Sequence, residues 1–155
     1  MASLAAGTAA AQANVRIEPV HLQGPRILEQ QTASAAIRDY LRAWRTLGTA
    51  MEQNRSDLLG AEFVGTAQDK LAETVDEQIK LGLSTHYQDQ AHDIQIIFYS
   101  PEGLSIELID TVKYDLQVLD GGKPIANQHT QARYHVILTP TAAQWKVRVF
   151  QGQSG

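Results

Sequence analysis

The chain of 155 residues contains no cysteine, and only 6% of its residues are aromatic. The absence of cysteine excludes disulfide bonds, thiolate nucleophiles and cysteine-based zinc sites. No apolar run reaches about eighteen residues, so we expect no membrane span in this chain. A net charge of −4 gives no reason to expect binding to nucleic acid. The 43% of hydrophobic residues suffices for the core of one domain.

Sequence motifs of common catalytic and metal sites are also missing. HExxH, P-loop, GxGxxG, GxSxG and EF-hand patterns do not occur. His86 and His92 lie six residues apart, and so do His129 and His135. At about 3.3 Å per residue in a strand, each pair is separated by about 20 Å, too far to share a metal ion. We therefore expect no metal site and no cofactor.

Both ends of the chain differ from its middle. Residues 1–31 begin with the alanine-rich stretch "MASLAAGTAAAQANV" and continue as an extended lead-in with one short strand within 15–22. The stretch lacks the basic start of a signal peptide. It is either a flexible extension or the end of a trimmed signal or anchor, which leaves a cytoplasmic and an extracytoplasmic location both open. Residues 151–155 are expected to form a tail.

Two helices are predicted by apolar residues at steps of three and four. The first runs for about twenty residues from Thr32 or Ser34, and the second from about 66 to 81, with Gly82 as its C-terminal stop. The first stripe consists of Ala33, Ile37, Tyr40, Leu41, Trp44, Leu47 and Met51, and the second of Phe63, Ala67, Leu71, Val75 and Ile79.

After Gly82 the period of the apolar residues falls to two, which is typical of strands. Strands are predicted at 86–99, 104–119, 130–138 and 144–150, joined by short turn sequences such as "DGGKP". Short connections favour an antiparallel meander. We therefore predict an α+β domain over residues 32–150, with the helices packed in the concave face of a curved antiparallel sheet of at least four strands.

Three stretches resemble a known superfamily. They are the opening helix "AAIRDYLRAWRTLG" with Tyr40 and Trp44, the short helix "DLLGAEFV", and the last strand "QWKVRVF". Over residues 32–150 the chain is similar to the NTF2-like (cystatin-like, SnoaL-type) superfamily. The resemblance implies a cone with a pocket between sheet and helices. The superfamily includes cyclases, isomerases, epoxide hydrolases and dehydratases, and also non-catalytic assembly and transport domains, which the long second helix favours here.

Strand alternation predicts which polar groups face the pocket. Asp110 lies between Leu108 and Val112 on the apolar face, where an unpaired charge is costly. It either accepts hydrogen bonds, is turned outward by a bulge at Asp110–Thr111, or acts as a general base beside tyrosine hydroxyls. The candidate pocket residues are His92, Asp110, Tyr114, Tyr134, Tyr40 and Trp44.

The other face of the sheet is predicted to carry an apolar strip. Exposed apolar strips commonly mark interfaces, so we expect a homodimer through this face. Its residues are Ile97, Tyr99, Ile109, Ile137 and Phe150. On the first helix, Arg38, Arg42 and Arg45 form a ridge that either pairs with acidic residues of the second helix or docks an acidic partner.

Two functions are consistent with these features. The first is a non-catalytic NTF2-like domain that binds a partner protein or a small apolar ligand. The alternative is an enzyme of the isomerase, cyclase or hydratase type, with Asp110 as the general base in an apolar pocket.

Overall fold

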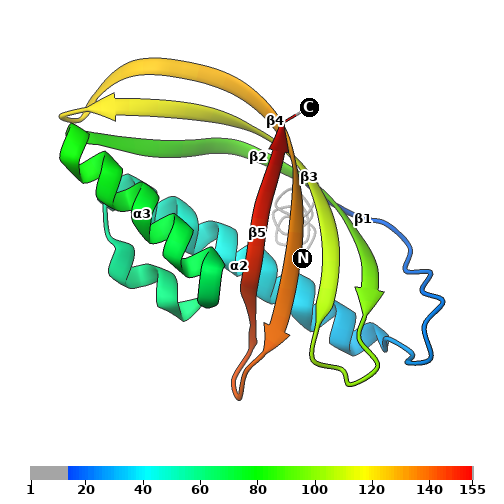
Figure 1. Ribbon diagram of the computed structural model, residues 1–155. Helices are drawn as coiled ribbons and strands as arrows, with labels where there is room; N and C mark the ends of the chain where they lie inside the picture. The colour runs from blue at the N-terminus through cyan, green and yellow to red at the C-terminus, as the bar shows by residue number, and fades with distance from the viewer. Residues whose placement is uncertain (1–13, 155) are drawn as a thin grey trace, which may run out of the picture.

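The structure is a computed structural model that describes residues 14–154. Two long helices and four long strands make up most of this part of the chain (Figure 1). The prediction of a flexible or trimmed segment at residues 1–13 lies outside the described residues. Within them, no helix has the length and apolar character needed to cross a membrane. The elements are β1 (Val15–Ile17), α2 (Gln30–Gln53), η1 (Ser56–Ala61), α3 (Gly65–Leu81), β2 (Leu83–Tyr99), β3 (Ile106–Asp120), β4 (Lys123–Pro140) and β5 (Trp145–Ser154).

The strands form one five-stranded sheet in the order β1-β2-β3-β4-β5. Strands β2 to β5 are antiparallel neighbours, so the predicted α+β architecture is confirmed. The lead-in adds the fifth strand, because β1 pairs with β2 in parallel and Val15 lies opposite His92. The long strands arch over both helices, which lie on the concave side of the sheet (Figure 1).

The apolar stripe of α2 forms the centre of the core. Ile37, Tyr40, Trp44 and Leu47 are all buried, because they project from one face of the helix into the concave side of the sheet. The stripe of α3 fits less well, since strict steps of four drift around an α-helix of 3.6 residues per turn. Ile79 is accordingly 54% exposed. Gly82 ends α3 with φ of 71°, as predicted.

A bulge near the end of β2 changes which side chains face the core. Ile96 pairs with Leu108 but Phe98 pairs with Glu107, so Ile97 is an extra residue. Beyond an extra residue, alternation is reversed. Phe98 consequently lies on the outer face, and Tyr99 is buried on the side of the helices. The prediction of Tyr99 as an outer-face residue was wrong for this reason.

A second bulge has the same effect in β5. Ile137 pairs with Val149 and Leu138 with Val147, which leaves Arg148 as the extra residue. Phe150 therefore lies opposite Val136, on the core side, and was wrongly predicted to be on the outer face. The strand also continues to Ser154, through residues that the sequence analysis assigned to a tail.

The first half of β4 extends beyond β5. Strand β5 pairs with Ala132–Pro140, whereas Lys123–Gln128 pair only with β3 among the described residues. This end of the sheet curves over α3 (Figure 1). Most of the side chains in this part of β4 are exposed.

The reversed alternation in β5 has a measurable consequence for stability. We expect Phe150→Ala to lower the free energy of unfolding by about 2–3 kcal/mol, because the ring packs against the core, and Val149→Ala to lower it by about 1 kcal/mol or less. Urea unfolding of both variants measures the difference. A larger loss for Val149→Ala would contradict the bulge at Arg148.

Candidate functional site

Asp110 lies at the centre of the sheet with its side chain fully buried. The ladder runs without interruption through this position, and Asp110 pairs with Ile94 on one side and Tyr134 on the other. No bulge turns the carboxylate outward at Thr111. The carboxylate therefore has to be stabilised by groups inside the protein.

Two donors serve a single oxygen of this carboxylate. The hydroxyl of Tyr40 donates to Oδ2 of Asp110 at 2.6 Å, and Nδ1 of His92 lies 2.7 Å from the same atom. Nε1 of Trp44 in turn donates to the hydroxyl of Tyr40 at 2.9 Å. The other oxygen, Oδ1, has no hydrogen-bond partner among the described residues. The four side chains form one chain of hydrogen bonds, which we call the Asp110 network.

The network determines which nitrogen of His92 carries a proton. Because a carboxylate oxygen only accepts, Nδ1 of His92 is the protonated nitrogen. Nε2 is the atom left for other contacts, and it lies 3.2 Å from Oε1 of Gln90. Because the amide oxygen of Gln90 only accepts, this contact is a hydrogen bond when Nε2 also carries a proton, as in the charged imidazole.

Aromatic rings surround Trp44 inside the concave face. Tyr114 and Tyr134 both pack against its ring, and their hydroxyls lie 3.3 Å apart, so they bond each other rather than Asp110. The rings around Trp44 are His92 at 5.3 Å, Tyr134 at 5.4 Å, Phe150 at 5.5 Å, Tyr87 at 6.0 Å and Tyr114 at 6.1 Å. The predicted pocket residues are thus brought together, but as a packed cluster.

Burial keeps the tyrosines of this cluster neutral. Burial, and next the charge of Asp110, raise the pKa of Tyr40 well above its usual value, so its hydroxyl remains a donor. Burial also raises the pKa of Tyr134, helped by its bond with Tyr114. For Tyr87, burial raises the pKa to about 12. None of these hydroxyls ionises near neutral pH.

A groove opens beside the network, between α2 and the β1–β2 edge of the sheet. Its volume is about 610 Å³, and His92 and Trp44 reach it from the network, whereas Asp110 does not. We call it the α2–β1 groove. Its walls are mainly apolar, with cationic groups from α2. The lining consists of Asn14, Val15, Ile17, Ser34, Ile37, Arg38, Leu41, Trp44, Arg45, Gln90 and His92.

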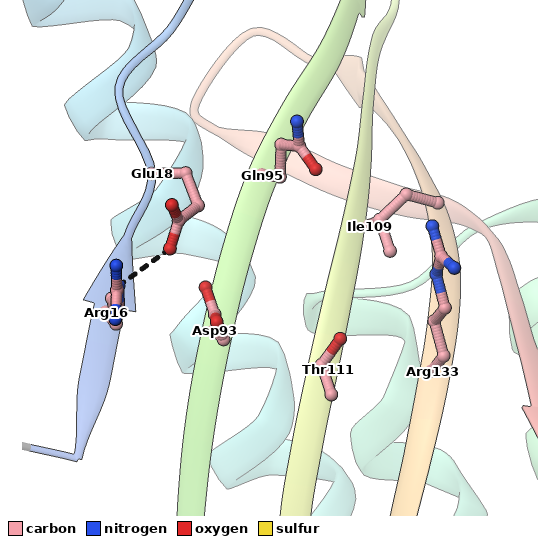
Figure 2. Close-up of a pocket in the computed structure, with 7 residues that line it drawn as sticks. All are labelled: Arg16, Glu18, Asp93, Gln95, Ile109, Thr111 and Arg133. Atoms are coloured by element: carbon pink, nitrogen blue, oxygen red, sulfur yellow. Dashed lines mark ion pairs between the residues drawn. The ribbon is translucent and has the colours of Figure 1, made fainter. Parts of the chain in front are cut away.

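A second, smaller concavity of about 340 Å³ lies on the opposite face of the sheet. Its side chains come from β1 and the residue that follows it, and from β2, β3 and β4 (Figure 2), and Arg16 pairs with Glu18 at 2.8 Å. Arg16, Asp93, Thr111 and Arg133 occupy one row across the sheet. Asp93 thus faces away from the Asp110 network. In residues 14–154 no group of three histidines or carboxylates is close enough to hold a metal ion.

Part of the groove was not predicted from the sequence. Pairing of β1 along the edge of the sheet adds Val15 and Ile17 to its walls. Tyr87 was not among the predicted pocket residues either, but a register shift between Gln88 and Ala91 turns it toward Trp44. The arginine ridge was the sequence feature that could have indicated the groove, because Arg38 and Arg45 line the groove. No ion pair between α2 and α3 is found among the described residues.

The cost of disrupting the Asp110 network is testable. We expect Asp110→Ala to lower the free energy of unfolding by about 3–5 kcal/mol, because His92 and Tyr40 then lose their buried partner. Tyr40→Phe should cost about 1–3 kcal/mol, since it removes one donor. Asp93→Ala, the exposed control on β2, should cost under about 0.5 kcal/mol. Chemical denaturation gives all three values, and equal losses for Asp110→Ala and Asp93→Ala would contradict the role assigned to the network.

Comparison with known proteins places this geometry in a structural class. No protein-family model and no curated protein sequence matches the chain. Among solved structures, the intermembrane space region of the chloroplast protein ARC6 is similar, with a TM-score of 0.65 at 14% identity, over 84% of this chain and 100% of that one. A candidate scytalone dehydratase from Novosphingobium aromaticivorans is similar with a TM-score of 0.50 at 18% identity, over 81% of this chain and 89% of that one. At these identities the likeness is one of fold, and the chain has the NTF2-like fold that its sequence resembles.

Proposed function

We propose that this chain is a non-catalytic binding domain, and that the α2–β1 groove holds an apolar ligand or an apolar segment of a partner protein. The observation that carries the proposal is the composition of the groove. Ile37, Leu41 and Trp44 provide an apolar wall from α2, and Val15 and Ile17 provide another from β1. Such a concave, mainly apolar surface with a few polar groups is typical of ligand sites.

The position of Asp110 argues against the enzymatic alternative. A general base has to come within hydrogen-bond distance of the proton that it removes. Asp110 is fully buried and lies outside the lining of the groove, and its Oδ2 is already bonded to Tyr40 and His92. An isomerase, cyclase or hydratase with Asp110 as the base would need this network to open.

Binding in the groove can be tested with decanoate, an apolar chain that carries one anionic group. We expect decanoate to shift the amide resonances of α2 and β1, because its chain contacts Leu41 and Ile17. Leu41→Asp should weaken binding by about tenfold or more, since it places a charge in the apolar wall. The matched control is Leu104→Asp, an exposed leucine outside the groove, which should bind as the wild type does. Shifts confined to other regions would contradict the proposal.

A second proposal concerns the outer face of the sheet, where we infer a homodimer interface. Ile97 and Phe98 are 42% and 45% exposed, and Ile109 and Ile137 are half-buried on the same face. These four residues form what we call the outer patch. It differs from the predicted strip, since Tyr99 and Phe150 face the core and Phe98 replaces them. Exposed apolar surface of this kind favours association.

The dimer is testable by sedimentation at micromolar concentration. The wild type should sediment as a dimer, and Ile137→Lys should yield a monomer because a charge at the centre of the patch would be desolvated on association. Ile125→Lys, an equally apolar but separate position with 58% exposure, serves as the control and should remain dimeric. A monomeric wild type would overturn this proposal and leave the groove proposal untouched.

A further inference from the structure

The edge strand β1 has backbone groups that its neighbour does not use. The N–H of His92 donates to the carbonyl of Asn14 at 2.6 Å, and the N–H of Glu18 donates to the carbonyl of Ile94 at 2.9 Å. In a parallel ladder with this register, the bonds of β1 come from alternate residues, which leaves Arg16 to supply those in between. The N–H and C=O groups of Val15 and Ile17 therefore point away from β2, toward the open edge.

The same two residues also line the α2–β1 groove. Val15 pairs with His92 and Ile17 with Ile94, so their side chains lie on the side of the helices. Ile17 remains 51% exposed in this position. A strand added to the edge of β1 would continue the sheet over α2. Every second side chain of the added strand would then face Ile37 and Leu41.

The charges of the groove favour an acidic occupant. Arg38 and Arg45 lie seven residues apart on α2, which corresponds to about 10 Å along the helix. Among the described residues, Arg45 has no carboxylate within ion-pair distance. Arg38 is largely exposed, and its carboxylate contact is Asp39, 3.5 Å away and shared with Arg42. Both guanidinium groups are available to a ligand that brings its own carboxylates.

We propose that the α2–β1 groove binds an extended acidic and apolar peptide segment of a partner protein, by addition of that segment as a strand to β1. The proposal rests on the function proposed above, since it names the partner of that same groove. A peptide is favoured over a lipid because the N–H and C=O groups of Val15 and Ile17, which have no partner among residues 14–154, alternate as the backbone groups of a strand do. Backbone bonds supply affinity in this binding mode, and side-chain pockets supply specificity.

The probe for this proposal is a short fluorescent peptide in which every second residue is threonine and the residues between are glutamate and valine in turn, so that glutamate and valine share the face that meets α2. We expect it to bind, and its fluorescence anisotropy to rise on titration with the protein. The same peptide with lysine in place of glutamate should bind at least about tenfold more weakly, because Arg38 and Arg45 repel it. Two further peptides carry methyl groups on every second backbone nitrogen, one at the odd and the other at the even residues. One of them should lose binding and the other should keep it, because a strand bonds its neighbour through alternate residues. This comparison needs no change in the protein.

Two pairs of protein variants separate the contribution of backbone hydrogen bonds to peptide binding from the contribution of charge. Ile17→Pro removes the free N–H but none that β2 uses, and should weaken peptide binding by about tenfold, whereas the matched Ile17→Val should change it less than about threefold. Reversal of both groove arginines, Arg38→Glu with Arg45→Glu, should make the lysine peptide the better ligand. The control is Arg133→Glu with Arg148→Glu, two exposed arginines outside the groove, which should keep the preference for glutamate.

The outcomes distinguish this proposal from the one on which it rests. If both methylated peptides bind as well as the parent, or if Ile17→Pro has no effect, strand addition is wrong. If decanoate still shifts the resonances of the groove in that case, the groove remains a ligand site. If neither decanoate nor the peptide perturbs α2 and β1, the function proposed for the groove fails as well.

Discussion

The rest of the structure depends on one buried carboxylate. Asp110 projects from the middle of β3 into the core, and its charge is stabilised by Tyr40 from α2 and His92 from β2. These bonds join the central helix to two neighbouring strands at one point. Both donors reach the same atom, Oδ2, and a donor from α2 and one from β2 on one atom leave little freedom for α2 to rotate or slide against the sheet. The position of Trp44, and of the rings around it, follows from that constraint.

The same network separates the interior from the groove. Trp44 and His92 each have one side in the aromatic cluster and another in the α2–β1 groove, so they form its inner wall. A ligand in the groove would contact His92 at the end of a hydrogen-bonded chain that begins at Asp110. The carboxylate orients the imidazole but remains beyond the reach of a ligand. This division separates the buried carboxylate from the surface to which the binding role is assigned as a proposal.

The spacing of the apolar residues and the turn sequences between them were enough to predict the helices and the antiparallel meander. They also predicted the inward direction of His92, Asp110, Tyr114 and Tyr134. Alternation failed where an extra residue enters a strand, at Ile97 and Arg148, and it misplaced Tyr99 and Phe150 as a result. Neither bulge contains a glycine that would have signalled it. The groove was not predicted because it depends on pairing between β1 and β2, which lie over seventy residues apart, and long-range pairing leaves no local pattern.

The part of β4 that extends beyond β5 gives the sheet a second open edge, whose chemistry differs from that of β1. Open edges invite indiscriminate pairing between molecules, which leads to aggregates. Here Lys123 and Pro124 begin the strand, and polar residues such as Asn127 and His129 follow. Charge and proline are the features by which natural sheets discourage such pairing. Pairing between copies of the protein is therefore discouraged along this part of β4, whatever the β1 edge binds.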